Sequence, residues 1–209
     1  PEIKERGNPV MEYIVHRVNT IAELKEVPTG YGVELDVRDD LTGRIYMQHD
    51  PFTDGEDFED YLKAFHHGTM IINVKSERIE HKVLKLLAAY PVQRYFFLDS
   101  SFPMIKLLSD LGEHSLAVRF SEYEGMDTLE AMAGRAEWVW VDTFQKLPLH
   151  AGVFGRMREL GYKVCLVSPE LQGQPEKLAP YAQQLRREGI LPDAVCCKAY
   201  QIAKWERYL

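Results

Sequence analysis

The sequence predicts a single (β/α)8 barrel, that is, a ring of eight parallel strands surrounded by helices. Eight short runs rich in Val, Ile and aromatic residues recur along the 209 residues, and segments with the apolar spacing of helices separate them. Strands that alternate with helices favour a parallel sheet, because parallel strands need a crossover connection. The chain is just long enough for a small barrel. An open doubly wound sheet is the structural alternative.

The predicted strands are short apolar segments that end in polar residues. They comprise residues 11–15, 31–37, 69–75, 94–99, 115–120, 137–142, 162–168 and 193–198. The longest connection that departs from the strand–helix alternation is RDDLTGRIYMQHDPFTDGE, residues 38–56. We expect this segment to form a short hairpin inserted after the second strand.

The predicted helices lie between these strands and after the last one. They comprise residues 21–27, 57–65, 76–90, 101–112, 127–134, 149–160, 178–189 and 200–209. Thr20 with Glu23 makes a capping box before the first helix, and Thr53 with Glu56 has the same spacing before the second. Ser76 is the expected N-cap of the third helix.

Composition sets the broad class. With 45% hydrophobic residues, the chain can bury one core, so we expect one domain spanning residues 1–209. The formal net charge is −7 without a Lys- or Arg-rich block, which argues against a nucleic-acid partner. No apolar run reaches the roughly 20 residues of a membrane span, and residues 1–10 lack the apolar core of a signal peptide. We therefore expect a cytoplasmic protein without stable membrane insertion; the sequence leaves its oligomeric state open.

Cysteine usage agrees with this class. Cys165, Cys196 and Cys197 lie inside apolar segments and lack the paired spacing of a zinc site. We expect reduced core thiols. Cys196 and Cys197 are adjacent on a predicted strand, so their side chains should point to opposite faces.

Polar residues gather at the carboxyl ends of the predicted strands. In a parallel barrel these ends form the working face, so polar side chains there are candidates for chemistry. Over the first three strands and the hairpin they are His16, Arg17, Glu34, Asp36, His49, Asn73 and Lys75. We expect them to meet at one rim.

Two of these residues form an acidic pair. Glu34 and Asp36 are two residues apart on one strand, so both carboxylates lie on the same face and repel each other when buried. A divalent cation would relieve this repulsion, and Asn73 can add an amide oxygen. Oxygen ligands without cysteine favour Mg²⁺ or Ca²⁺ over zinc. The alternative is that the two carboxylates cap loops or pair with Arg38 and Lys75.

Two histidines reach the same rim. His16 follows the first strand and His49 lies in the inserted hairpin. One histidine can take a proton while the other donates one to a leaving oxygen, which makes the two catalytic candidates. Either histidine could instead attack phosphorus as a nucleophile.

The rest of the rim supplies further cations and a pocket wall. Lys75, Arg119 and Lys198 could hold a phosphate group. Trp140 and Asp142 lie on one face of the sixth strand, where both would line the pocket wall. A structural ion pair between Arg119 and Asp142 explains these two residues equally well.

The motifs HRVN, GVELDV, QHDPF and NVK together resemble those of the glycerophosphodiester phosphodiesterase family, within the phospholipase-C-like phosphodiesterase superfamily. They are also similar to the spider-venom sphingomyelinase D branch. The resemblance covers roughly residues 12–76, and SSFPMIKLLSDLG at residues 100–112 is similar to a segment of the phosphodiesterases. Beyond residue 120 only the layout is shared.

This resemblance implies a (β/α)8 barrel that binds a divalent cation and cleaves phosphodiesters with two histidines. His16 and His49 match the family's catalytic histidines, and Arg17 matches its phosphate-contacting arginine. Glu34 and Asp36 match metal ligands.

The third-strand motif both matches and departs from the family. Lys75 matches its lysine, whereas Asn73 stands where the phosphodiesterases typically have glutamate and the venom branch has aspartate. A neutral ligand implies weaker metal binding or a different metal. HRVN also lacks the glycine that commonly follows the histidine–arginine pair in the phosphodiesterases. In this respect it is more similar to the venom enzymes.

These observations favour a metal-dependent phosphodiesterase of small molecules, with either water or a substrate hydroxyl as nucleophile. The net acidity disfavours docking on an anionic membrane, so a water-soluble diester is expected. A non-catalytic phosphate- or phosphosugar-binding protein on the same barrel is the main alternative, although binding alone would not require both His16 and His49. A metal-dependent aldolase or isomerase that uses Lys75 or Lys198 ranks last, because it leaves the histidines unexplained.

Overall fold

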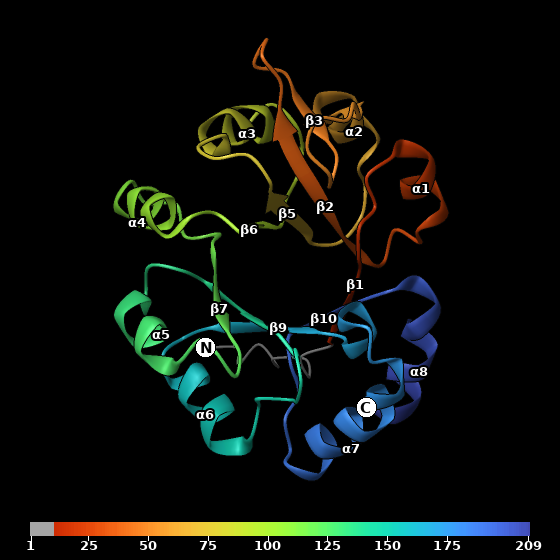
Figure 1. Cartoon of the computed structure of the whole chain (residues 1–209), viewed down its shortest axis with the longest axis vertical. Helices are drawn as coiled ribbons and strands as arrows, with labels where there is room; N and C mark the ends of the chain where they lie inside the picture. Colours follow the sequence, from red (N-terminus) through yellow and green to blue (C-terminus); the bar gives the residue numbers. More distant parts are fainter. Residues whose placement is uncertain (1–10) are drawn as a thin grey trace, which may run out of the picture.

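The chain forms a ring of eight parallel strands with its helices on the outside (Figure 1), so the predicted (β/α)8 barrel is confirmed. The computed structural model describes residues 11–209; residues 1–10, where the predicted domain begins, lie outside this part. In chain order the barrel strands are β1 (Glu12–Val15), β2 (Gly32–Asp39), β5 (Met70–Val74), β6 (Tyr95–Leu98), β7 (Ala117–Phe120), β8 (Trp138–Val141), β9 (Lys163–Val167) and β10 (Ala194–Cys197).

The pairing of these strands runs around the ring. β1 pairs with β2 on one side and with β10 on the other, and parallel ladders continue through β5 to β6 and through β9 and β8 to β7. The ring closes between β6 and β7, where an isolated bridge from Phe97 to Leu116 replaces a ladder. The sheet therefore has one weak junction.

The segment after β2 forms the expected hairpin. β3 (Ile45–Met47) pairs antiparallel with the end of β2, and β4 (Glu56–Asp57) pairs antiparallel with β3. The loop between β3 and β4 carries His49. The insertion thus extends β2 beyond the barrel and brings its own polar loop back to the rim.

Helices connect successive barrel strands and cover the ring (Figure 1). They are α1 (Ile21–Glu26), α2 (Phe58–Ala64), α3 (Glu80–Leu87), α4 (Phe102–Asp110), α5 (Met126–Met132), α6 (Ala151–Glu159), α7 (Leu178–Arg187) and α8 (Ile202–Tyr208). Short 3-10 helices, η1 (Pro169–Gln172) and η2 (Pro175–Lys177), precede α7, and η3 (Ala199–Gln201) precedes α8.

Two of the predicted helix caps are wrong. The box of Thr20 and Glu23 is present at α1, but the N-cap of α2 is Asp57, whose carboxylate accepts from two backbone amides. Glu56 belongs instead to β4 and accepts from the amide of Ile21. Ser76 accepts from the amide of Asp39, and α3 starts four residues later without a side-chain cap. Glu56 and Ser76 therefore accept hydrogen bonds from distant backbone amides and do not cap the helices that follow them.

Alternation along the strands divides the core into two layers. Side chains that point into the ring form a small inner cluster, in which Phe96 and Trp138 stack with ring centroids 4.6 Å apart. Side chains that point outward pack under the helices in a larger cluster. Cys196 belongs to the inner cluster and Cys197 to the outer one, and all three cysteines are free and buried, as predicted.

Among residues 11–209, no helix has the length and apolar character needed to cross a membrane.

Candidate active site

The acidic pair lies inside the barrel at the end of β2. Glu34 and Asp36 are each 1% exposed, and Asn73 is the neighbour of Asp36 across the β2–β5 ladder. Asn73 Nδ2 donates to Glu34 Oε1 at 2.8 Å. Burial, followed by repulsion from Asp36, raises the pKa of Glu34 to about 7. The structure therefore brings the three predicted metal ligands together.

Two oxygens of this group lack a hydrogen-bond partner. Asp36 Oδ1 and Asn73 Oδ1 are buried and unpartnered within the described residues. Lys75 Nζ lies 3.7 Å from Asp36 Oδ1. Unpartnered buried oxygens beside two repelling carboxylates fit a hard divalent cation. In the described part of the chain, no cluster of three or more His, Cys, Asp or Glu could hold a metal, so this set depends on the amide oxygen of Asn73.

His16 follows β1 and lies against the acidic pair. Its Nε2 is 3.7 Å from Glu34 Oε2, and its side chain is 19% exposed. Burial, with the positive charges of Lys198 and Arg17, lowers the pKa of His16 to about 3. The imidazole is therefore neutral at pH 7.

Arg17 has a backbone conformation that is uncommon for a residue with a side chain. Its φ of 56° lies in the left-handed region. In this conformation its amide donates to Glu34 Oε2 at 2.7 Å. Its Nε lies 3.7 Å from Asp36 Oδ2, and its side chain is 44% exposed. The local strain thus directs both the amide and the guanidinium toward the acidic pair.

His49 reaches the same rim from the hairpin. Arg38 Nη2 donates to the carbonyl of His49 at 2.6 Å, and the His49 amide donates to Gln48 Oε1 at 2.9 Å. The Nδ1 atom of His49 lies 2.8 Å from Asp50 Oδ1, which orients the ring. Gln48, the residue before His49, lines the same cavity as Arg17, so the hairpin places His49 near the end of the first strand.

Sequence reasoning assigned no role to Asn19. Its Nδ2 donates to Asp36 Oδ2 at 2.8 Å, and its Oδ1 accepts from the amide of Asp36 at 2.8 Å. This double contact fixes the orientation of Asp36. The only signal for it in the sequence is its position three residues after His16, at the end of the first strand.

The remaining rim cations differ in how they are paired. Lys75 Nζ lies 3.2 Å from Asp99 Oδ2, and Arg119 forms close ion pairs with both Asp99 and Asp142. Burial alone would raise the pKa of Asp99, but Arg119 and Lys75 outweigh it and hold this pKa below its ordinary value. Arg119 thus pairs with two carboxylates, and one of them is Asp142, the partner in the alternative that explains Arg119 as part of a structural ion pair.

The predicted pocket wall joins the same network. Trp140 Nε1 donates to Asp142 Oδ1 at 3.2 Å, and both residues are almost fully buried. Burial raises the pKa of Asp142 to about 6, although Arg119 opposes the shift. Trp140 and Asp142 are therefore packed inside the mouth of the barrel and expose little of their side chains.

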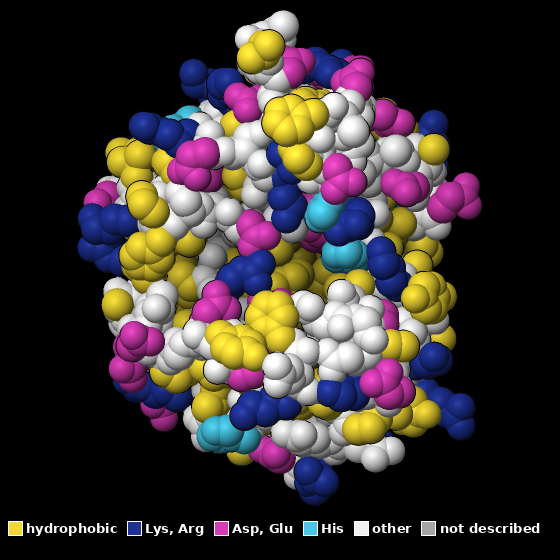
Figure 2. Space-filling view, viewed as in Figure 1, with side chains coloured by type: hydrophobic (Ala, Val, Ile, Leu, Met, Phe, Trp, Pro, Cys, Tyr) yellow, Lys and Arg dark blue, Asp and Glu magenta, His cyan; other side chains and the backbone are white. Residues whose placement is uncertain are grey.

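A cavity of about 590 Å³ opens between two of the predicted phosphate-binding cations, Arg17 and Lys198, and Asn19 and Gln48 also line it. No carboxylate lies within 4 Å of the Lys198 ammonium in the described part of the chain. The backbone amide of Lys198 donates to Glu170 Oε1 at 3.0 Å. Figure 2 shows a hollow in the middle of this face with His, Lys or Arg, and Asp or Glu side chains at its edge. Glu23, Asp54 and Glu56 line the same cavity, so cations and carboxylates share its wall.

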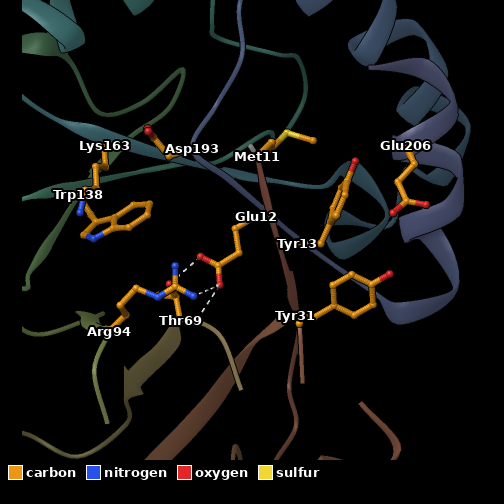
Figure 3. Close-up of a pocket in the computed structure, with 11 residues that line it drawn as sticks. Met11, Glu12, Tyr13, Tyr31, Thr69, Arg94, Trp138, Lys163, Asp193 and Glu206 are labelled. Atoms are coloured by element: carbon orange, nitrogen blue, oxygen red, sulfur yellow. Dashed lines mark hydrogen bonds and ion pairs between the residues drawn. The ribbon is translucent and has the colours of Figure 1, made fainter. Parts of the chain in front are cut away.

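A second cavity, of about 500 Å³, lies at the opposite ends of the strands (Figure 3). Its Glu12 carboxylate accepts from the amide and the hydroxyl of Thr69, both at 2.7 Å, and Arg94 lies 3.4 Å away. Met11, the first described residue, also lines it. None of the predicted site residues lies there.

No protein-family model matches the chain. No curated protein sequence matches it either.

Two phosphodiesterases are among the solved structures that share this fold. Glycerophosphodiester phosphodiesterase from Agrobacterium tumefaciens superposes with a TM-score of 0.64 at 15% identity, over 90% of this chain and 96% of that one. An Oleispira antarctica phosphodiesterase, solved in complex with the product sn-glycerol-3-phosphate, gives a TM-score of 0.63 at 16% identity, over 94% of this chain and 96% of that one. At such identities the similarity establishes the fold, which is that of the glycerophosphodiester phosphodiesterases.

Proposed function

We propose that this chain, with the fold of the glycerophosphodiester phosphodiesterases, cleaves small phosphodiesters by proton transfer between His16 and His49. The observation that carries the proposal is the position of His16 beside a buried acidic pair with unpartnered oxygens on Asp36 and Asn73, at the rim to which the β3–β4 hairpin brings His49. The Oleispira neighbour holds sn-glycerol-3-phosphate. Glycerophosphodiesters are therefore the natural substrates to test first.

The residues have distinct roles in this proposal. Glu34, Asp36 and Asn73 would hold a divalent cation, which supplies Lewis-acid stabilisation of the phosphoryl oxygens when bound. Arg17, whose side chain is 44% exposed, adds positive charge beside them. His16, neutral at pH 7, accepts the proton of the attacking hydroxyl.

The reaction then needs a proton donor for the leaving group. As the attacking oxygen bonds to phosphorus, the bond from phosphorus to the leaving oxygen breaks, and His49 protonates that oxygen. Asp50 holds the His49 ring through Nδ1 at 2.8 Å, so Nε2 is free for this transfer. The nucleophile is water or a hydroxyl of the substrate, and the latter would give a cyclic phosphate.

Hydrolysis of bis(p-nitrophenyl) phosphate tests this proposal in EDTA and with Mg²⁺, Ca²⁺ or Mn²⁺. We expect metal-dependent turnover that falls by about 10²- to 10⁴-fold in His16→Ala and in His49→Ala. The matched control is His66→Ala, an exposed histidine after α2, which should retain wild-type activity. Turnover that survives both substitutions would exclude the two-histidine mechanism. A cation that binds without any turnover would favour the phosphate-binding alternative.

A further inference from the structure

The turn after β9 contains a hydrogen-bonded chain of side chains that ends at the rim. Trp205 Nε1 of α8 donates to Ser168 Oγ at 2.8 Å, and the Ser168 hydroxyl donates in turn to Glu170 Oε2. The other carboxylate oxygen, Glu170 Oε1, accepts from the backbone amide of Lys198 at 3.0 Å. Trp205 and Ser168 are both 0% exposed, so the packing around them fixes the inner part of this chain.

The segment that Glu170 holds also contacts the backbone of the candidate active site. The His16 amide donates to the Cys197 carbonyl at 2.9 Å, and Lys198 is the next residue in the chain. Lys198 is extended, and side chains alternate along an extended segment. Cys196 points into the ring, so the side chain of Lys198 points to the same inner side.

The Lys198 ammonium remains available to an anion. It forms no ion pair with a carboxylate in the part of the chain that the structure describes, and Lys198 lines the cavity of about 590 Å³ together with Arg17. A lysine side chain is flexible, so the reach of its ammonium depends on where its backbone is held. Glu170 binds that backbone and leaves the ammonium unpaired.

We infer that Glu170 is a positioning residue, which holds Lys198 where its ammonium binds the phosphate group of the substrate. The inference rests on the proposed phosphodiesterase function and adds a residue to it. A carboxylate that contributed only its charge would repel the phosphate, whereas one that positions the lysine strengthens phosphate binding. Removal of the carboxylate therefore has opposite effects on affinity in the two cases.

A double-mutant cycle with phenyl phosphate, titrated by phosphorus-31 NMR at a fixed Mg²⁺ concentration, tests this inference. We expect the dissociation constant to rise about tenfold or more in Lys198→Met, which removes the cation. It should rise about three- to tenfold in Glu170→Ala, which releases the lysine backbone. In the Lys198→Met background, Glu170→Ala should change the constant by less than about twofold, because Glu170 acts through Lys198.

Three further variants serve as controls. Glu170→Gln keeps an oxygen that accepts from the Lys198 amide, so its affinity should stay within about twofold of wild type. Glu176→Ala removes an exposed carboxylate from η2 and should leave affinity unchanged. Glu170→Asp, whose carboxylate is one methylene shorter, should weaken binding as Glu170→Ala does, and it replaces that variant if thermal unfolding shows that the alanine chain does not fold.

Hydrolysis of bis(p-nitrophenyl) phosphate by the same variants separates this inference from the proposed function. The expected cycle in phenyl phosphate binding supports the role of Glu170 even if no diester is cleaved. Additive losses in the double variant would overturn it, as would tighter binding in Glu170→Ala, which is the effect of charge alone. Turnover that requires His16 and His49 but is unchanged in Glu170→Ala would leave the phosphodiesterase and remove the positioning role.

Discussion

Asn73 controls the balance of charge beside the acidic pair. A carboxylate at this position would be the third in a buried group, whereas the amide donates to Glu34 Oε1 at 2.8 Å and so stabilises the site without a cation. The amide oxygen remains unpartnered. A single amide thus stabilises the site without a cation, and under the proposed function it would bind a divalent cation less tightly than a carboxylate would.

Asn73→Asp tests this role of the amide. We expect the free energy of unfolding in EDTA to fall by about 1–3 kcal/mol, because a donor to Glu34 is replaced by a repelling carboxylate. Saturating Mg²⁺ should recover most of the loss, since the ion binds only the folded state. Urea unfolding with and without Mg²⁺ measures both effects. Gln93→Glu, the same change at an exposed position, should shift stability by no more than about 0.5 kcal/mol. An Asp variant as stable as wild type in EDTA would contradict this view of Asn73.

The β3–β4 hairpin is the element that places His49. Gly55 precedes β4, and a Cβ built on it would lie 2.0 Å from the backbone oxygen of Met47. Close approach of the two backbones therefore requires glycine at this position. Because Arg38 and Gln48 hold His49 through the same hairpin, a shift of β4 would be transmitted to the histidine.

Gly55→Ala should displace His49 while the barrel stays folded. We expect kcat/KM for bis(p-nitrophenyl) phosphate to fall by about 10- to 100-fold, as misplacement of a catalytic group by about 1 Å can do. Steady-state kinetics and thermal unfolding of the same preparation measure activity and stability together. Gly155→Ala on α6, where a Cβ meets nothing within 4 Å, should leave activity unchanged. Unaltered activity in Gly55→Ala would show that the hairpin does not position the histidine.

For the whole molecule, ion pairs take over where the hydrogen-bonded sheet is interrupted. Asp99 follows β6 and Arg119 belongs to β7, so their pairing joins the two strands beyond the single bridge. Asp142 of the β8 end completes the network. Closure of the ring therefore depends on charged side chains at the rim.

Removal of Arg119 should weaken this closure. We expect Arg119→Met to lower the free energy of unfolding by about 2–4 kcal/mol at pH 8, because the buried Asp142 carboxylate loses its cationic partner and keeps only neutral donors such as Trp140 Nε1. The folded pKa of Asp142, about 6, is above its ordinary value, so its favourable contribution is present below pH 4 and is lost as pH rises through 6. The variant should raise this pKa further, and its deficit should be smaller at pH 5.

Urea unfolding at pH 5 and pH 8 measures this difference. Arg156→Met removes an arginine that also contacts two carboxylates, Glu130 and Glu159, but on an exposed surface. It should cost much less than Arg119→Met at either pH. Equal losses in the two variants would contradict a structural role of Arg119 at the junction.

The sequence by itself determined the order and type of the elements and the identity of the acidic pair. Apolar runs and capping residues are local signals, so all eight strands, the hairpin and the first capping box followed from them. The spacing of Glu34 and Asp36 placed both on one face, since side chains alternate along a strand.

Only the tertiary structure decided how these residues are paired. Thr53, Ser76 and Glu56 read as caps, but Thr53 donates to the nearby carbonyl of Asp50, whereas Ser76 and Glu56 accept from the amides of distant residues. Asn19 makes two hydrogen bonds to Asp36, and Arg119 pairs with two carboxylates. Both sets of contacts depend on strands that the ring brings together. Hydrogen bonds and ion pairs between distant residues depend on distances that closure of the barrel sets, and local sequence does not encode those distances.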